Sequence, residues 1–358
     1  QTLNCNKKYR LEIIEGIKVH WIKNAYNNKF SYEKRIISFL KFIFKSTYTS
    51  LNIDCDIIFA TSTPLTIAIP ALILAFIKRK PFIFEVRDMW PDLPIATGAI
   101  SNKFIIFCVK KLELITYKRA SHIIALAPGM RKDIIRKGIN KNKVSVIPNA
   151  CDLDIFQRSE KIKLRDDIDW LRDRKLIIYA GALGFLNNVI DLAKVAIEIN
   201  KIDPEIRILV IGDGKDKKFI KQYAIEKKIY NKNFFMIDAM SKKDLAKWLA
   251  VSNLQIALFK GPKVLWKDAV QNKFFDSIAS GKPIACNFNG WQTKIAIKNE
   301  IGFYINTENP KSAAKTIINY LDDFDWLNNV EEKAKNLAEN EFNRDKLVKK
   351  LSQILKKV

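Results

Sequence analysis

The chain has 358 residues, of which 48% are hydrophobic and 28% are charged, so its composition is that of an ordinary globular protein. The formal net charge of +24 favours an anionic partner such as nucleic acid, acidic lipid or a phosphorylated substrate. The chain has two histidines, too few to favour a zinc site or a Ser-His-Asp triad. Its five cysteines are widely spaced, which favours a reduced, cytoplasmic protein.

Short β-branched segments alternate with longer amphipathic segments, which is typical of parallel α/β layers. The expected strands cover residues 17–22, 57–60, 82–86, 122–125, 144–147, 176–180, 206–211, 234–236, 254–258, 283–285 and 302–305. The expected helices cover residues 32–48, 66–77, 103–119, 129–137, 189–199, 215–227, 242–250, 271–279, 310–322 and 331–357. Several strands are apolar on both faces, as buried parallel strands are.

A stretch between Cys151 and Arg174 is dense in charge and interrupts this alternation. We therefore expect two doubly wound α/β domains. The expected parts are an N-terminal Rossmann-like domain (1–157), a linker (158–173), a C-terminal Rossmann-like domain (174–335) and a C-terminal helix (336–358) that packs back on the first domain. Ligands of such domains bind at the carboxyl ends of the strands, here expected in a deep cleft between the domains.

Charged and aromatic side chains cluster directly after the expected strand at 82–86. They are Glu85, Arg87, Asp88, Trp90 and Asp92. Functional residues collect at this edge of an open α/β sheet, and a plain loop would seldom need all of them. The segment therefore predicts a site in the first domain.

Glycine-containing turns follow two strands of the second domain. Gly181 and Gly184 would let backbone N–H groups and a helix N-terminus approach a phosphate, although a plain strand–turn–helix junction would look the same. The Gly-Asp-Gly sequence around Asp213 lacks the third glycine of a dinucleotide fingerprint.

The expected helix at 271–279 carries a lysine and an aspartate on one face. Lys273 lies in the first turn, where a lysine is unfavourable unless it faces an anion. Asp276 can accept hydrogen bonds from sugar or ribose hydroxyls. A solvated surface lysine and carboxylate would show the same spacing.

The chain resembles retaining glycosyltransferase family 4 in segments that follow the family's order: EVRDMWPDLP, YKRASHIIALAPGM, VSVIPNACDLDIF, YAGALG, ILVIGDG and NKFFDSIASGKP. Within that family it is most similar to the bacterial N-acetyl-L-fucosaminyltransferase-like branch of O-antigen and capsule assembly. The resemblance covers nearly the whole chain. It implies the GT-B fold, with two facing Rossmann-like domains, a nucleotide-sugar held mainly by the second, and neither a cofactor nor a required metal. The family's leading strand and Gly-rich loop are expected to be missing.

The resemblance also implies roles for individual residues. The family's paired acids fall on Asp268, expected near the sugar, and Asp276, expected on the ribose; both are shortened from Glu. The usual diphosphate-binding Arg and Lys fall on Ala182 and Asn187, so Lys273 is the expected replacement. Backbone amides of Gly181 and Gly184 are expected to help. The implied catalytic set is Asp88, Arg87, Lys273 and Asp268. The implied donor-binding set is Gly181, Gly184, Asn187, Asp213, Asp238, Ala239, Met240, Asn272, Lys273 and Asp276. The implied acceptor-side set is Glu85, Trp90 and Asp92.

The implied reaction moves a sugar, such as an N-acetylated deoxy-hexosamine, from a UDP-linked donor to a lipid-diphosphate-linked sugar or glycan, with retention. Either a same-face attack or an Asp-stabilised oxocarbenium-like transition state would serve. Residues 39–48, 66–80 and 103–119 mix large apolar side chains with Lys and Arg, which favours attachment to the anionic inner face of the cytoplasmic membrane. Nucleic acid is not expected as a partner, because the aromatic residues lie mostly inside apolar runs. The alternatives are a catalytically degenerate GT-B scaffold and a nucleotide-sugar epimerase.

Overall fold

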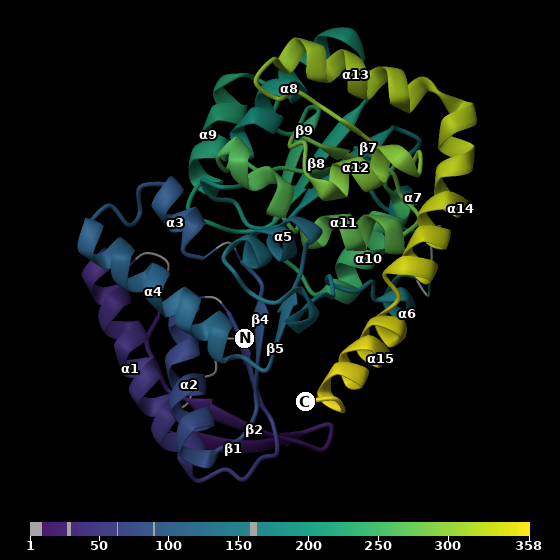
Figure 1. Ribbon diagram of the computed structural model, residues 1–358. Helices are drawn as coiled ribbons and strands as arrows, with labels where there is room; N and C mark the ends of the chain where they lie inside the picture. Colours follow the sequence, from purple (N-terminus) through teal and green to yellow (C-terminus); the bar gives the residue numbers. More distant parts are fainter. Residues whose placement is uncertain (1–8, 27–29, 63, 89, 158–162) are drawn as a thin grey trace. The chain divides into compact units, whose positions relative to one another are not determined.

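The structure is a computed structural model that describes residues 9–26, 30–62, 64–88, 90–157 and 163–358 (Figure 1). The described chain divides into two compact units. The first comprises the residues up to Ala125 together with Arg131–Ser145 and Ile354–Val358, and the second comprises Leu126–Met130 and Val146–Gln353. Cys5 and residues 158–162 of the predicted linker lie outside the described residues.

The first unit is built on a four-stranded sheet. Its strands, in spatial order, are β3 (Ile58–Thr61), β4 (Phe82–Val86), β5 (His122–Ala125) and β6 (Val144–Val146). Strand β4 pairs parallel with both β3 and β5 and is buried along nearly its whole length, which explains its continuous apolar sequence. A separate antiparallel hairpin joins β1 (Tyr9–Ile14) to β2 (Ile17–Ile22).

Helices of the first unit follow the apolar periodicity of the sequence. They are α1 (Tyr32–Leu51), the 3₁₀ turn η1 (Leu65–Ile67), α2 (Ala68–Lys78), α3 (Asp92–Ala96), α4 (Lys103–Arg119), the 3₁₀ turn η2 (Lys141–Lys143) and α5 (Pro128–Arg136), whose first turn belongs to the second unit. Helix α2 packs on β3 and β4 and lies between α1 and α4. Asn102 caps the start of α4, because its side chain accepts the N–H groups of Phe104 and Ile105.

The second unit contains a six-stranded parallel sheet. In spatial order its strands are β12 (Gly302–Tyr304), β11 (Ile284–Cys286), β10 (Leu254–Ala257), β7 (Leu176–Ala180), β8 (Arg207–Ile211) and β9 (Phe234–Ile237). From β7 the chain runs outward through β8 to β9, and then returns to the other side of β7 with β10. Parallel α/β sheets bind their ligands at the carboxyl ends of strands where the order reverses in this way.

The helices of the second unit connect the strands of this sheet and extend beyond it. They are α6 (Leu153–Gln157), α7 (Lys163–Asp166), α8 (Ile190–Ile202), α9 (Lys217–Glu226), α10 (Lys242–Val251), the 3₁₀ turn η3 (Lys263–Asp268), α11 (Asn272–Ala279), α12 (Trp291–Lys298), α13 (Pro310–Asp322), α14 (Phe324–Glu341) and α15 (Arg344–Leu355), whose last two residues belong to the first unit. The core lies between β7, β8, α8 and α13, where residues such as Ile177, Val210, Leu192 and Ile317 are fully buried.

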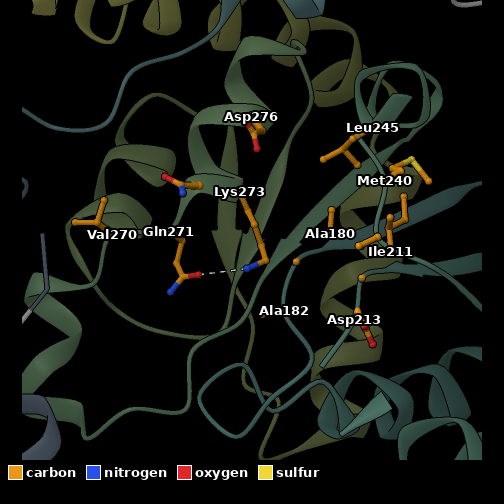
Figure 2. A pocket seen from close by; sticks show the side chains of 14 residues that line it. Ala180, Ala182, Ile211, Asp213, Met240, Leu245, Val270, Gln271, Lys273 and Asp276 are labelled. Atoms are coloured by element: carbon orange, nitrogen blue, oxygen red, sulfur yellow. Dashed lines mark hydrogen bonds between the residues drawn. The ribbon is translucent and has the colours of Figure 1, made fainter. Parts of the chain in front are cut away.

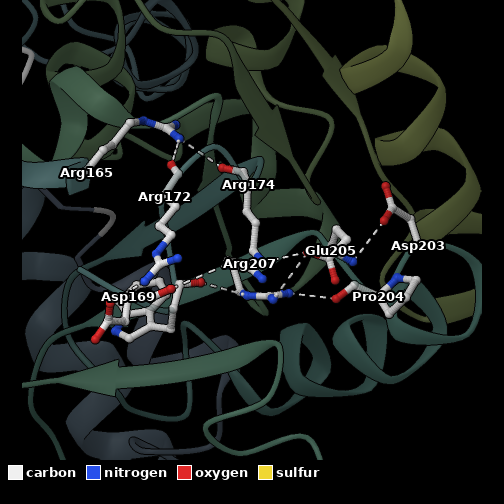
Figure 3. A network of polar contacts seen from close by, with 9 residues as sticks. Arg165, Asp169, Arg172, Arg174, Asp203, Pro204, Glu205 and Arg207 are labelled. Carbon is white, nitrogen blue, oxygen red and sulfur yellow. Dashed lines mark hydrogen bonds and ion pairs between the residues drawn. The ribbon is translucent and has the colours of Figure 1, made fainter. Parts of the chain in front are cut away.

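An arginine network ties the charged segment after α6 to the amino ends of β7 and β8 (Figure 3). The Arg165 guanidinium donates to the carbonyls of Arg172 (2.8 Å) and Arg174 (3.0 Å). Arg207 donates to the carbonyl of Trp170 (3.0 Å), whose ring stacks on Phe235 with centroids 4.0 Å apart. Residues 165–174 are therefore fastened to the sheet of the second unit, at the edge opposite the carboxyl ends of its strands.

Most of the predicted elements are confirmed, several residue for residue: residues 82–86, 122–125 and 176–180 as strands, and 103–119 and 310–322 as helices. The single helix expected at 331–357 is wrong. The chain forms α14 and α15 with a break at Phe342 and Asn343, because the Phe342 ring packs against Phe275 and its carbonyl accepts the N–H of Cys151 at 2.8 Å. Strand β1 and the helices α3, α6, α7 and α12 were not predicted.

Candidate functional site

A pocket of about 550 Å³ opens at the carboxyl ends of β7 and β8 in the second unit (Figure 2). The turn after β9, helix α10 and the first turn of α11 complete it. The lining residues are Ala180, Gly181, Ala182, Ile211, Gly212, Asp213, Ala239, Met240, Leu245, Val270, Gln271, Asn272, Lys273 and Asp276. The pocket thus lies beside the strand reversal between β7 and β10, where the topology predicts a ligand.

Close backbone contact between the turns after β7 and β8 shapes one wall of the pocket. A Cβ atom on Gly212 would lie 1.9 Å from the Gly181 carbonyl oxygen, and one on Gly214 would lie 2.1 Å from that of Leu183. The N–H of Leu183 donates to the Asp213 carbonyl at 2.9 Å. Gly212 and Gly214 are therefore required because the turns after β7 and β8 pack closely against each other.

Lys273 supplies a cation inside the pocket (Figure 2). Its Nζ lies 4.8 Å from the centroid of the Tyr179 ring and 3.4 Å from Gln271 Oε1. Burial lowers the pKa of Lys273 to about 8, although the nearby Asp276 carboxylate acts in the opposite direction. The ammonium is therefore charged in neutral solution but close to losing its proton.

Gly181 makes room for this ammonium. A Cβ atom at that position, where φ is +151°, would lie 2.8 Å from Lys273 Nζ. The N–H of Gly181 donates to the Ile211 carbonyl at 2.9 Å, as part of the sheet. This differs from the expectation that the Gly181 amide would face a phosphate: the residue contributes space rather than a donor.

The N-terminus of α11 adds backbone donors to the same wall. Its N-cap residue, Gln271, makes no capping bond with its side chain, and its own N–H donates to Gln292 Oε1 at 2.8 Å. Val270 to Lys273 all line the pocket. First-turn N–H groups and a lysine together attract an anion of the size of a phosphate.

Asp276 lies one turn farther along α11 and also lines the pocket. Its Oδ1 is 2.9 Å from Lys242 Nζ. Burial raises the pKa of the Asp276 carboxyl, whereas the Lys242 and Lys273 ammonium groups lower it. A largely buried carboxylate beside a phosphate-sized anion site is suited to accept hydrogen bonds from neighbouring hydroxyls.

The pocket brings together Gly181, Asp213, Ala239, Met240, Asn272, Lys273 and Asp276 from the predicted donor set. Gly184, Asn187, Asp238 and Asp268 do not line it. Asp238 is an exposed partner of Lys217. Asp268 is buried and forms an ion pair with Lys267 at 2.7 Å. Its Oδ1 lies 2.2 Å from the position that a Cβ atom on Gly129 would take, so Asp268 packs against the first turn of α5.

The predicted residues of the first unit follow β4. Glu85 Oε2 accepts a hydrogen bond from the Thr61 hydroxyl at 2.5 Å and lies 3.9 Å from an Arg87 guanidinium nitrogen. The Asp88 carbonyl accepts the N–H of Trp90 at 2.8 Å. The structure therefore groups Glu85, Arg87 and Asp88 at the strand end.

Asp92, also predicted on the acceptor side, has a partner within the first unit. Its carboxylate lies 3.5 Å from Lys137 Nζ, and the same ammonium pairs with the buried Glu113. Burial raises the pKa of Glu113, although Lys137 acts against this. Asp92 thus helps to fix α3 against α4 and α5.

Several pocket residues escaped the sequence analysis, above all Gln271, Leu245 and, behind the lining, Lys242. Gln271 could have been found as the residue before the predicted helix, whereas the contact of Lys242 with Asp276 depends on the packing of α10. Within the described ranges, no three His, Cys, Asp or Glu side chains are placed to hold a metal ion. In that same part of the chain, no helix is long and apolar enough to cross a membrane.

Two family models match the chain. The model for glycosyl transferases group 1 matches residues 160–344, and the model for glycosyltransferase family 4 matches residues 6–155. The chain is 20% identical to an uncharacterized glycosyltransferase of Methanocaldococcus jannaschii, MJ1069, over 99% of its own length and 85% of that protein's. It is 17% identical to the lipopolysaccharide 1,2-N-acetylglucosaminetransferase of Salmonella typhimurium over 60% of its own length and 56% of that protein's.

Solved structures share the fold. Anabaena Alr3699/HepE in complex with UDP-glucose has a TM-score of 0.72 at 16% identity, with 88% of this chain and 82% of that chain covered. Sucrose-phosphate synthase of Thermosynechococcus elongatus has a TM-score of 0.72 at 12% identity, with 94% and 83% covered. These likenesses confirm the expected two-domain α/β fold of the GT-B type.

Proposed function

This chain belongs to the group 1 glycosyl transferases, and we propose that it transfers a sugar from a UDP-linked donor, with retention and without a metal. One observation supports the donor site most strongly: Lys273, the N-terminus of α11 and Asp276 lie in one pocket at the strand reversal. An ammonium beside backbone N–H groups suits a diphosphate, and a buried carboxylate suits ribose hydroxyls. The likeness to a structure in complex with UDP-glucose supports uridine as the base.

We propose a same-face transfer. The bond between sugar C1 and the β-phosphate oxygen breaks, and UDP leaves with the electron pair. The acceptor hydroxyl oxygen bonds to C1 on the same face, and its proton passes to the leaving phosphate. Lys273 and the α11 N–H groups stabilise the charge that develops on UDP. The Arg87 and Asp88 pair at the end of β4 is proposed to act on the sugar and the acceptor.

The proposed acceptor is a lipid-diphosphate-linked sugar or glycan of bacterial surface polysaccharide synthesis, and the proposed donor sugar is an N-acetylated deoxy-hexosamine. The similarity to a lipopolysaccharide N-acetylglucosaminetransferase supports this class of acceptor. Exposed aromatic residues on helices α1, α2 and α4, of which α1 and α4 are also rich in Lys and Arg, support peripheral attachment to an anionic membrane surface.

Calorimetric titration with UDP, GDP and ADP and with their sugars, in the presence of EDTA, tests the donor. We expect UDP and at least one UDP-sugar to bind, Asp276→Ala to abolish binding, and Lys273→Ala to weaken it. Incubation of the bound UDP-sugar with a lipid-linked acceptor then separates two enzymes: a transferase needs the acceptor, whereas an epimerase releases UDP and an altered sugar without it. Absence of binding by every nucleotide would contradict the proposal.

A further inference from the structure

Lys242, the first residue of α10, lies directly behind the pocket carboxylate. Its Nζ is 2.9 Å from Asp276 Oδ1, forms a second ion pair with Asp152, and lies 5.7 Å from the centroid of the Phe156 ring. Lys242 does not line the pocket, whereas Asp276 does. The ammonium therefore reaches the donor site only through the carboxylate.

Asp152 is itself held in place. Its carboxylate also pairs with Arg344, the first residue of α15. The preceding residue, Cys151, donates its N–H to the Phe342 carbonyl at 2.8 Å, and its thiol to the Phe275 carbonyl at 3.4 Å. Backbone and side-chain contacts thus fix the row of charges Arg344, Asp152, Lys242 and Asp276 within the second unit.

We propose that Lys242 is a positioning residue for donor binding: it keeps the Asp276 carboxylate ionised and oriented toward the pocket, and Asp152 with Arg344 keeps Lys242 in place. This inference rests on the proposed function, in which Asp276 accepts hydrogen bonds from the ribose. An ionised carboxylate accepts from both ribose hydroxyls, whereas a protonated one has lost part of that capacity.

The charged groups around Asp276 determine the direction of the effect. Burial favours the protonated carboxyl, and two ammonium groups oppose it: Lys242 from α10 and Lys273 from its own helix. The Cys151 thiol, on the segment before α6, has a pKa raised to about 12 by burial and so stays neutral. Of these two ammonium groups, Lys273 alone remains to favour ionisation when Lys242 is removed, so Asp276 takes up a proton at a higher pH than in the native chain.

The test is the affinity for UDP, measured by calorimetry between pH 5.5 and 7.5, of the native chain and of Lys242→Gln, Lys242→Met, Lys242→Arg and Lys243→Gln. We expect the Gln and Met variants to bind roughly tenfold more weakly at the acidic end and to recover part of the loss as the pH rises. Lys242→Arg should restore the native profile, because it keeps the charge. Lys243, the exposed neighbour on α10, supplies the matched control for loss of one positive charge. The ionisation of UDP is the same for all variants and cancels in the comparison.

A double variant then shows whether Lys242 acts through Asp276. Lys242→Gln combined with Asp276→Asn should bind UDP no more weakly than Asp276→Asn alone. Three outcomes would overturn the inference while leaving the proposed function intact. The two substitutions could weaken UDP binding additively, the Lys242→Gln variant could lose the same affinity at every pH, or Lys242→Arg could fail to restore binding. A native chain that binds no nucleotide would instead overturn the proposed function, and this inference with it.

Discussion

At the scale of single residues, the lowered pKa of Lys273 makes donor binding sensitive to alkaline pH. Its ammonium is charged below about pH 8 and neutral above it. A bound diphosphate favours the charged form, so affinity for UDP should fall as pH rises beyond that value. Calorimetry at pH 7, 8 and 9 checks this, and Lys273→Arg should move the loss to higher pH. An affinity that is constant over this range would contradict the role of Lys273.

The same residue should destabilise the unliganded fold. Burial lowers the pKa of Lys273 below its value in the unfolded chain, so burying the charged ammonium costs folding free energy. This cost is complete below about pH 8, and it disappears as the pH rises through the pKa of the unfolded chain. Lys273→Met should therefore raise the free energy of unfolding at pH 7 by on the order of 1 kcal/mol while it weakens binding of UDP. Urea denaturation at pH 7 measures the change. A destabilised variant would show that Lys273 mainly supports the fold.

At the scale of elements, contact between the turns after β7 and β8 predicts that alanine is destabilising at one glycine and nearly neutral at another. A Cβ on Gly212 would lie 1.9 Å from the Gly181 carbonyl oxygen, whereas one on Gly184 would meet nothing within 4 Å. Gly212→Ala should cost roughly 1–3 kcal/mol of stability and distort the pocket. Gly184→Ala, the matched control, should stay within about 0.5 kcal/mol of the native chain. Urea denaturation and affinity for UDP measure both, and equal effects would contradict the packing described.

Local sequence was sufficient for elements that have apolar runs and clear ends. Asn102 caps the start of α4. Asn309 caps the start of α13, where its side chain accepts the N–H of Ser312 and Pro310 is the first helical residue. The break between α14 and α15 has no such local signal. It depends on Phe342 packing against Phe274, Phe275 and Trp291, residues that are distant in sequence. Tertiary contacts of this kind override a helical pattern.

The site was predictable to a similar extent. Helical spacing put Lys273 and Asp276 on one face, but their assignment to a donor site, like that of Asp213, came from the resemblance to a family. The sequence could not reveal that the Gly181 N–H is used by the sheet, or that Lys242 reaches Asp276 from another helix. Both facts depend on how the segments pack in three dimensions. The resemblance to a family supplied the ribose role of Asp276, which spacing alone does not.

At the scale of the whole molecule, the net charge of +24 and the exposed aromatic side chains of α1, α2 and α4 predict that the protein binds anionic vesicles. Phe44 is 82% exposed, Phe76 83% and Phe104 73%, and lysines such as Lys41 and Lys78 lie on the same helices. Sedimentation with phosphatidylglycerol vesicles should show binding that weakens from low to high salt, because exposed charge pairs are screened. Phosphatidylcholine vesicles should bind much less.

Aromatic insertion can be separated from a purely electrostatic attraction. The double variant Phe44→Ser, Phe76→Ser keeps every charge but removes two exposed rings of the first unit, so it should bind phosphatidylglycerol vesicles roughly tenfold more weakly. Phe219→Ser is the matched control, because this ring is 63% exposed but lies on α9 of the second unit. If all three proteins bind alike, charge alone attracts the chain to the membrane. If Phe219→Ser is the weaker binder, the membrane-facing surface lies on the second unit, and the assignment to α1, α2 and α4 is wrong.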